Sequence, residues 1–289
     1  MRTSVIAANG LQFHCLEEGA GPLALCLHGF PDHAPTWSLQ LQSLAQAGYR
    51  AVAPFMRGYA PTGAPPDGPF QTAALAQDVV ALIDALGGAP AVVIGHDWGA
   101  AAAYGAAVIA PEKIRKLVTL AVPYGGAVAT AFVTNPLQQR RSWYMFFFLL
   151  PIADAALAHD DFAMVRRLWR DWSPGFELPD DEMAALIDTF RAPGTAQAAL
   201  GYYRHSMLPD RQRPELAAIQ ARLRRDPIHV PTLYLHGADD GCIGAEVGAD
   251  QSGFFPAGHR RVVIDGAGHF LHREKPDAVN GEILGFLRA

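Results

Sequence analysis

One pentapeptide combines a candidate nucleophile with the small residues that a sharp turn requires. Gly95-His-Asp-Trp-Gly99 lies between a short apolar run, 91–94, and a segment of small residues. Where such a turn leads from a buried strand into a helix, its middle residue is raised above the sheet in a strained conformation. That residue is Asp97, so the pattern predicts a carboxylate nucleophile rather than a hydroxyl or a thiol. An aspartate that only caps the helix is the alternative interpretation.

An acid later in the chain follows another expected strand. Asp240 comes after the apolar run 232–235 and stands three residues beyond Gly237. A carboxylate held at such a position can orient a histidine that acts as a base. The spacing favours Asp240 over its neighbour Asp239, although a turn rich in aspartate and glycine would also account for the segment.

A histidine that this acid can orient closes the segment Gly266-Ala-Gly-His269. The glycines let His269 turn into a site without steric conflict. It is favoured over His272, which is expected to begin the C-terminal helical segment. Asp97, Asp240 and His269 then follow one another along the chain as nucleophile, acid and base.

A further segment, His28-Gly-Phe-Pro31, follows an early apolar run and is expected to face the nucleophile. A loop in this place supplies one backbone N–H of an oxyanion hole. Phe30 is the predicted donor, because Pro31 has no N–H. The second donor is the N–H of Trp98, directly after the nucleophile. We also expect His28, Pro31 and the side chain of Trp98 to contact the substrate; a plain turn after a strand is the alternative.

Apolar runs of strand length alternate with segments of helical periodicity near both ends of the chain. This alternation is typical of an α/β fold whose mostly parallel sheet is covered by helices on both faces. Asn9-Gly10 predicts a hairpin turn between the first two strands. The expected strands are two within 3–16, then 23–27, 49–54, 91–94, 117–121, 232–235 and 261–264, and the expected helices are 37–47, 73–86, 99–109 and 278–288.

The alternation stops after Pro123 and resumes about a hundred residues later. The intervening segment has helical character, is rich in tryptophan, phenylalanine and arginine, and contains no clear strand. A chain of 289 residues is long enough for one large domain with an insertion. We therefore predict a core made of residues 1–124 and 229–289, with a helical cap of residues 125–228 inserted between its two parts.

Composition argues against several classes of protein. Half of the residues are hydrophobic, and the net charge of −5 gives no basic surface for nucleic acid. Arg222, Arg224 and Arg225 are interpreted as the solvated end of a helix. The apolar run 144–152 is too short to span a bilayer, and no signal peptide is evident at the N-terminus, so no membrane association is expected. Three scattered cysteines predict no metal site and a reducing compartment, the cytoplasm.

The chain resembles the epoxide hydrolase and haloalkane dehalogenase branch of the α/β-hydrolases over nearly its whole length, with the cap less similar. The segments that carry the resemblance are His28-Gly-Phe-Pro31, Arg57-Gly-Tyr59, Gly95-His-Asp-Trp-Gly-Ala100, Gly237 to Asp240 and Gly266-Ala-Gly-His269. The resemblance implies an α/β-hydrolase fold with a buried site between core and cap. It also implies attack by an aspartate on a saturated carbon, without a cofactor.

Two cap segments resemble those in which epoxide hydrolases carry a pair of tyrosines. They are Ser142-Trp-Tyr144 and Gly201-Tyr-Tyr-Arg204. The resemblance makes Tyr144 and Tyr203 the acids that hydrogen-bond the epoxide oxygen, whereas aromatic packing in the cap is the alternative. The implied activity converts a small-molecule epoxide to a vicinal diol through an alkyl ester on Asp97, released by water that the histidine–acid pair activates.

Haloalkane dehalogenation with the same nucleophile is the main alternative. It needs two N–H donors for the halide; Trp98 can be one, and Trp143, Trp169 or Trp172 remain candidates for the other because Phe30 replaces the asparagine often found there. Fluoroacetate dehalogenases have arginine where Trp98 stands, and an aspartate nucleophile disfavours a serine-type esterase. A non-catalytic ligand-binding protein of this fold is the alternative from another class. The sequence does not indicate an oligomeric state.

Overall fold

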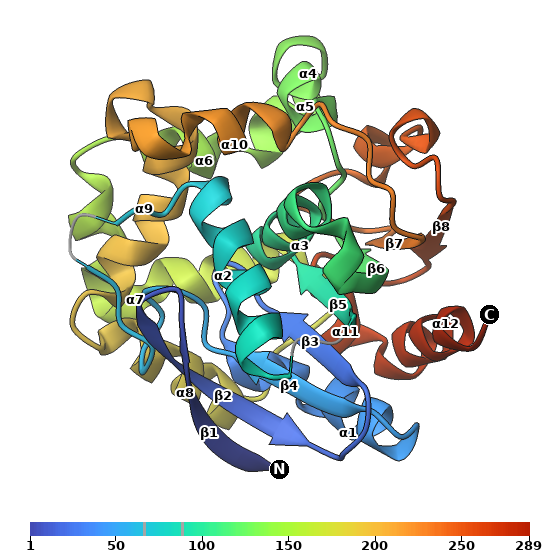
Figure 1. The fold of residues 1–289 in the computed structure, drawn as a ribbon. Coiled ribbons are helices and arrows are strands. Elements are labelled where there is room, and N and C mark those ends of the chain that lie inside the picture. The colour runs from blue at the N-terminus through green and yellow to red at the C-terminus, as the bar shows by residue number, and fades with distance from the viewer. Residues whose placement is uncertain (66–67, 88–89) are drawn as a thin grey trace.

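An eight-stranded sheet runs through the centre of the molecule (Figure 1). The computed structural model describes residues 1–65, 68–87 and 90–289. Neighbouring strands follow the order β1-β2-β4-β3-β5-β6-β7-β8. Their bounds are β1 (Arg2–Ala8), β2 (Leu11–Glu18), β3 (Leu23–Leu27), β4 (Arg50–Pro54), β5 (Ala91–His96), β6 (Ile114–Leu120), β7 (Thr232–Gly237) and β8 (His259–Ile264).

The sheet is mostly parallel, as the sequence predicts. Strands β4, β3, β5, β6, β7 and β8 pair in parallel, whereas β2 is antiparallel to both β1 and β4. All five residues of β3 are buried, which explains why this strand is one continuous apolar run. The expected hairpin turn joins β1 to β2, with positive φ angles of 44° at Asn9 and 74° at Gly10, as a tight two-residue turn requires.

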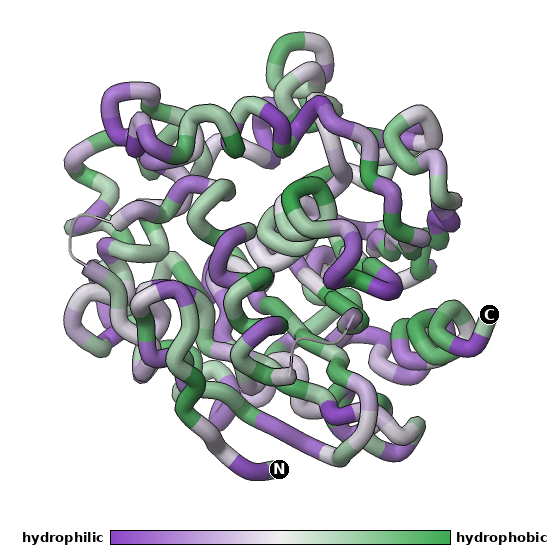
Figure 2. The backbone as a smooth tube through the Cα atoms, viewed as in Figure 1, coloured by the Kyte–Doolittle hydropathy of each residue, from purple (hydrophilic) through white to green (hydrophobic). Residues whose placement is uncertain are grey.

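Helices cover both faces of the sheet. Helices α2 (Thr72–Ala85) and α3 (Trp98–Ile109) pack on one face, and α1 (Ser38–Gln46) and α12 (Pro276–Arg288) pack on the other. The strands contribute alternate side chains to the two layers: Leu25 and Val93 face α2 and α3, while Cys26 and Ile94 face α1 and α12. In Figure 2 the central strands and α3 are accordingly the more hydrophobic parts of the chain.

Between β6 and β7 the chain leaves the sheet and forms helices only; we call residues 125–228 the helical insertion. It contains α4 (Ala127–Thr134), α5 (Pro136–Arg141), α6 (Trp143–Phe147), α7 (Ala153–Trp172), α8 (Asp180–Arg191), α9 (Thr195–Met207) and α10 (Ala217–Arg222). Helix α7 is interrupted by non-helical angles at residues 159–162. The insertion packs on the loop after β3, where Phe148 and Tyr203 place their ring centroids 5.3 and 5.5 Å from that of Phe30.

A buried ion pair joins three separate parts of the core. Arg57, in the loop after β4, donates from Nε to a carboxylate oxygen of Asp78 on α2 at 2.7 Å. Asn9, in the β1–β2 turn, donates to the other oxygen at the same distance. Only 5% of the Arg57 side chain and 6% of the Asp78 side chain are exposed, so water contributes little to neutralising either charge.

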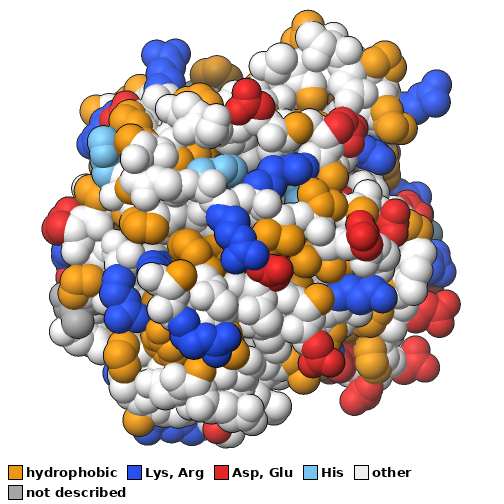
Figure 3. Space-filling model, turned by 90° about the vertical axis from the view of Figure 1, so that its right-hand side faces the viewer, with side chains coloured by type: hydrophobic (Ala, Val, Ile, Leu, Met, Phe, Trp, Pro, Cys, Tyr) orange, Lys and Arg blue, Asp and Glu red, His pale blue; other side chains and the backbone are white. Residues whose placement is uncertain are grey.

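One face of the molecule has mixed charge. On the face drawn in Figure 3, acidic and basic side chains are interspersed with apolar ones, and neither sign forms a continuous area. Among the residues that the structure describes, no helix combines the length and the apolar character needed to cross a membrane.

Candidate active site

Asp97 occupies the turn between β5 and α3. Its backbone has φ 52° and ψ −118°, a strained conformation for a residue with a side chain. The glycines around it are required by close packing: a Cβ on Gly95 would collide with the carbonyl of Gly99, and a Cβ on Gly99 with the carbonyl of Leu27. Gly29 is equally constrained, because a Cβ there would collide with the Asp97 carboxylate. The sequence pattern therefore has the steric cause that the prediction assumed.

Two groups contact the Asp97 carboxylate. The N–H of Phe30 donates to Oδ1 at 2.8 Å, and Nε2 of His269 lies 3.7 Å from Oδ2. Trp98 is the first residue of α3, where backbone N–H groups have no carbonyl acceptor within the helix. Burial raises the pKa of Asp97, but His269 and the Phe30 amide outweigh it, so the pKa lies below its usual value. The carboxylate is therefore ionised at neutral pH.

His269 and Asp240 meet at the ends of β8 and β7. Nδ1 of His269 lies 2.9 Å from Oδ2 of Asp240, whose Oδ1 accepts the N–H groups of Cys242 at 2.7 Å and Ile243 at 2.9 Å. Burial raises the pKa of Asp240, but the two histidines beside it hold it well below its usual range. Burial lowers the pKa of His269, but Cys242 and the carboxylates of Asp240 and Asp97 outweigh this and raise it. Asp239 is exposed, whereas Asp240, the acid that the spacing favours, lies against His269.

The competing histidine lies elsewhere. His272 is on the short helix α11 (Leu271–Glu274), and its Nε2 is 2.9 Å from Oγ1 of Thr36. Its ring stacks on Trp37 with a centroid separation of 4.6 Å. With Asp32 and His96 it forms a buried group whose possible ligand atoms lie within 4.8 Å of one another. Burial raises the pKa of Asp32 to about 7 and lowers that of His96 to about 3, so at neutral pH His96 is uncharged and Asp32 is only partly ionised.

A second histidine contacts the same carboxylate oxygen of Asp240 as His269 does. Nε2 of His236 is 3.2 Å from Oδ2 of Asp240 and 2.8 Å from the carbonyl oxygen of Ile243. Both oxygens are acceptors, so Nε2 must carry a proton. Nδ1 of His236 is hydrogen-bonded to the hydroxyl of Tyr234. The sequence prediction did not single out this histidine, and only its place before Gly237, in the segment that carries Asp240, pointed to it.

The last turn of α7 supports both loops that carry the histidine and the acid. The carbonyl oxygen of Trp172 accepts the N–H of His269 and the N–H of Gly241, each at 3.0 Å. The hydroxyl of Ser173 accepts the N–H of Phe270 at 3.2 Å. Two loops from the core are thus held by one peptide group of the helical insertion.

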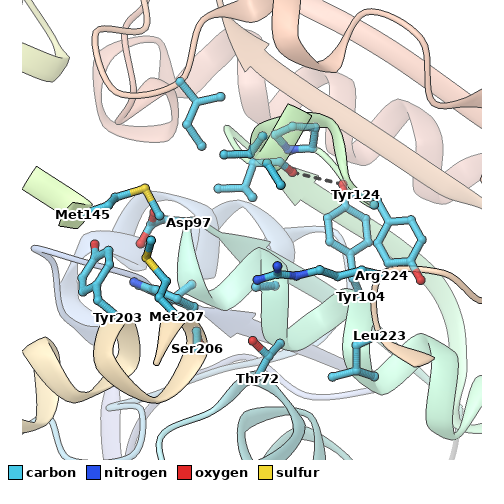
Figure 4. Close-up of a pocket in the computed structure, with 18 of the residues that line it drawn as sticks. Thr72, Asp97, Tyr104, Tyr124, Met145, Tyr203, Ser206, Met207, Leu223 and Arg224 are labelled. Carbon is cyan, nitrogen blue, oxygen red and sulfur yellow. Dashed lines mark hydrogen bonds between the residues drawn. The ribbon is translucent and has the colours of Figure 1, made fainter. Parts of the chain in front are cut away.

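A cavity of about 360 Å³ opens onto Asp97 (Figure 4). Tyr144 on α6 and Tyr203 on α9 line it together with Asp97 and Trp98. The hydroxyl of Tyr144 lies 3.1 Å from Sγ of Cys242, whereas the hydroxyl of Tyr203 has no hydrogen-bond partner among the described residues. Burial, followed by nearby groups that include Asp97, raises the pKa of both tyrosines well above the usual value. Both are therefore neutral O–H donors.

Two predicted substrate contacts are not found in the wall of this cavity. Nδ1 of His28 lies 3.0 Å from the carbonyl oxygen of Gly29, and its Nε2 accepts the N–H of Met56 at 3.0 Å, so both ring nitrogens bind backbone groups. Burial lowers the pKa of His28 to about 4, so the ring is neutral. The carbonyl of Pro31 accepts the indole N–H of Trp169 at 2.8 Å. We correct the prediction accordingly: His28 and Pro31 fix the loop that carries Phe30.

The tryptophans considered as halide donors are placed differently. Trp143 is partly exposed, with the guanidinium of Arg167 5.0 Å from its ring centroid. The indole N–H of Trp169 is occupied by Pro31. Trp172 packs against His269 with a centroid separation of 5.1 Å, and the indole nitrogen of Trp98 has no partner among the described residues. Trp98 is thus the tryptophan of this set that lines the cavity.

The apolar segment 145–150 divides its side chains between packing and the cavity. Met145 lines the cavity, and Phe148 is buried against the core. Phe146 and Leu150 are 44% and 51% exposed. Arg224 also lines the cavity, although the sequence indicated only a solvated helix end there. Nothing in the basic sequence 222–225 tells which of its side chains turns inward.

Comparison with known proteins defines the class of this fold and site. A family model described as the alpha/beta hydrolase fold matches residues 22–276. The chain therefore belongs to the α/β hydrolase fold family. Epoxide hydrolase 4 of Mus musculus is 30% identical over 98% of this chain and 78% of its own length. An epoxide hydrolase of Caballeronia sordidicola is 30% identical over 98% of this chain and 92% of its own length.

Solved structures agree with this placement. The crystal structure of a Bacillus megaterium epoxide hydrolase in complex with an inhibitor has a TM-score of 0.86 and 27% identity, and the match covers 99% of this chain and 100% of that one. Within the family, the chain is an epoxide hydrolase-like enzyme, a hydrolase of the class that acts on ether bonds.

Proposed function

We propose that this enzyme converts epoxides to vicinal diols through a covalent alkyl ester on Asp97. The observation that carries the proposal is the composition of one cavity wall: an ionised carboxylate in a nucleophile turn shares it with two neutral tyrosines. Opening an epoxide needs a nucleophile for the carbon and a proton donor for the oxygen. Tyr144 and Tyr203 can supply the proton donor, and because they are neutral they do not compete with Asp97 as nucleophiles.

In the first step, a carboxylate oxygen of Asp97 attacks one epoxide carbon. The carbon–oxygen bond of the ring breaks, and the oxygen takes a proton from Tyr144 or Tyr203. Among the described residues the hydroxyl of Tyr203 has no hydrogen-bond partner, so it can turn toward a substrate without losing such a bond. The product of this step is a hydroxyalkyl ester of Asp97 and one tyrosinate.

In the second step, neutral His269 removes a proton from water, and the water attacks the carbonyl carbon of the ester. Alkylation has by then removed the negative charge of Asp97, one of the groups that raise the pKa of His269. The imidazole therefore becomes a better base once the ester has formed. The N–H groups of Phe30 and Trp98 stabilise the tetrahedral oxyanion. The proton that ester hydrolysis releases restores the tyrosine.

The helical insertion has the part of a cap in this proposal. Residues 125–228 supply both tyrosines and residues 1–124 and 229–289 supply Asp97, Asp240 and His269, so the reaction takes place where the two meet. The route uses a carboxylate, a phenol and an imidazole, and it needs no cofactor. The three cysteines are unpaired, which suits a reducing compartment such as the cytoplasm.

The decisive experiment separates the two steps. Purified protein is incubated with aryl and alkyl epoxides, and diol formation is followed beside the Asp97→Ala variant, which should be inactive. The His269→Gln variant should gain the mass of one substrate molecule and then stop, because the ester forms but water is not activated. Diol formation by Asp97→Ala, or no mass gain by His269→Gln with a substrate that the wild type turns over, would contradict the proposal.

Asp240 can be tested with a neighbour as its control. Asp240→Asn removes the charge that orients His269, whereas Asp239→Asn changes an exposed carboxylate one residue away. We expect the first variant to lose most of its ester hydrolysis and the second to retain it. Equal effects of the two variants would remove Asp240 from the mechanism.

Haloalkane dehalogenation is the second candidate. Trp98 lines the cavity, and its buried indole nitrogen has no hydrogen-bond partner among the described residues, so its N–H could donate to a halide. The same assay decides the matter when 1-haloalkanes are included. Halide release without diol formation from any epoxide would favour this function.

A further inference from the structure

Arg224 brings an unpaired charge to the wall of the catalytic cavity. It follows α10 and lines the cavity onto which Asp97 opens. In Figure 4 its side chain projects into the space between the labelled residues. Within the part of the chain that the structure describes, it makes no hydrogen bond or ion pair, whereas Arg222 donates to Asp226 at 2.7 Å. Its position is therefore not explained by a partner in the protein.

The cavity has two charged positions of opposite sign. Among the described residues that line it, only Asp97 and Arg224 are charged. The remaining wall is mostly apolar and includes Ala101, Val122, Val128, Phe132 and Leu223. The hydroxyl oxygen of Ser206, in the same wall, is buried and has no partner among the described residues. A ligand in this cavity thus meets a nucleophile, an apolar wall and a guanidinium.

We propose that the preferred substrates are epoxides carrying a carboxylate, joined to the epoxide by an apolar chain, and that Arg224 binds this carboxylate. The inference rests on the proposed function and adds the substrate class. A planar guanidinium matches a carboxylate through two parallel N–H donors. The charge of Asp97 repels the same carboxylate, so only one orientation of the substrate brings the epoxide to the nucleophile.

Solvent limits the size of the effect. Arg224 is exposed, so its attraction for a carboxylate is partly screened. We expect a preference of roughly three- to tenfold in kcat/KM for the free acid over its uncharged ester. The preference should fall as salt is added, because the Debye length shortens from about 10 Å at 0.1 M to about 3 Å at 1 M. The preference should also depend on chain length, because a short chain cannot place the epoxide at Asp97 and the carboxylate at Arg224 at the same time.

The test uses terminal epoxides of unsaturated fatty acids of increasing chain length, each beside its methyl ester. The ratio of kcat/KM for acid and ester is measured for the wild type, Arg224→Gln, Arg224→Lys and Arg225→Gln. Arg225 is the matched control, since it is exposed, adjacent and outside the cavity wall. We expect the acid to be preferred by the wild type and Arg225→Gln, less strongly by Arg224→Lys, and not at all by Arg224→Gln.

Binding provides a readout that does not depend on turnover. A saturated fatty acid and its methyl ester are titrated into each variant, with the fluorescence of the protein as the signal. Tighter binding of the acid that Arg224→Gln abolishes supports the inference even if the epoxides are not hydrolysed. Equal acid-to-ester ratios in the wild type and Arg224→Gln, in both assays, would overturn it. If the epoxide group of the methyl-ester substrates is still opened to a diol, and this requires Asp97, the proposed function would remain intact.

Discussion

Asp97 and His269 are coupled because each carries a charge that stabilises the other. In the free enzyme, Asp97 and Asp240 both lie beside His269, at 3.7 and 2.9 Å, and both favour its protonated form. Such an imidazolium lowers the pKa of Asp97 and keeps this carboxylate, the proposed nucleophile, ionised. In the proposed ester intermediate, Asp240 is the carboxylate that still carries a charge beside His269. The two steps of the proposed reaction therefore respond differently to pH.

We predict that ester formation is nearly independent of pH from neutrality into the acid range, since the lowered pKa keeps Asp97 ionised. Ester hydrolysis needs neutral His269, whose pKa is raised, so its rate should fall about tenfold per pH unit below the pKa in the intermediate. Rapid-quench experiments with mass spectrometry should then find more ester at lower pH. Accumulation that increases toward higher pH would have the wrong sign for this mechanism.

His236 is predicted to be a positioning residue for the acid. Its Nε2–H lies against Oδ2 of Asp240 and offsets part of the negative charge that His269 senses. His236→Leu removes this donor, so the pH limb of ester hydrolysis should move to higher pH. The variant should also lose about 1–3 kcal/mol of stability, because the carbonyl of Ile243 and the hydroxyl of Tyr234 lose a buried partner.

The conservative variant His236→Gln is the control, because its amide can still donate to Asp240. It should hydrolyse the ester with a pH dependence close to that of the wild type. If both variants lose stability while neither shifts the pH limb, the role of His236 is structural only.

Most residues of the candidate site could be placed from the sequence, because the proposed nucleophile, acid and base each follow a strand in a short segment rich in glycine. His236 and Arg224 could not, since their roles depend on contacts between segments far apart in the sequence. His28 illustrates the opposite error. Its place beside a catalytic loop suggested a substrate contact, but two backbone groups take up both of its nitrogens.

At the scale of elements, the turn between β5 and α3 depends on the absence of side chains. Gly99→Ala would drive a Cβ into the carbonyl of Leu27, and we expect a loss of about 1–3 kcal/mol of stability or more, together with most activity. Gly281→Ala is the matched change in α12, where a Cβ meets nothing within 4 Å. There the helix should gain about 0.5–1 kcal/mol. Urea unfolding measures both values, and similar effects at the two glycines would refute the steric argument.

The sheet and its helices could largely be predicted because their sequence patterns have local causes. Strands buried on both faces, such as β3 and β5, are apolar throughout, and the predicted helix 99–109 corresponds to α3. The helical character of residues 125–228 was equally apparent. The packing of helices α4 to α10 against one another could not be predicted. The side chains that meet between them, such as Tyr144 and Tyr203, are about sixty residues apart in the sequence.

At the scale of the whole molecule, the ion pair of Arg57 and Asp78 links the edge hairpin, the loop after β4 and α2. Asp78→Asn should cost about 3–5 kcal/mol of stability, since a buried guanidinium loses its counter-charge. Asp84 lies on the same helix as Asp78, and Asp84→Asn breaks its ion pair with Lys113; because the Asp84 side chain is 51% exposed, the cost should be about 0–1 kcal/mol. Thermal unfolding of the two variants compares them directly, and equal losses would argue against a special role for the buried pair.

The carbonyl of Trp172 has a consequence for recombination between relatives. It accepts the N–H groups of both Gly241 and His269, so the loops carrying Asp240 and His269 are held in register by a peptide group of the helical insertion. The insertion is therefore not a detachable module. A chimaera that exchanged residues 125–228 as a block would inherit new pocket walls. The chimaera would be active only if the replacement segment placed a backbone carbonyl where that of Trp172 lies.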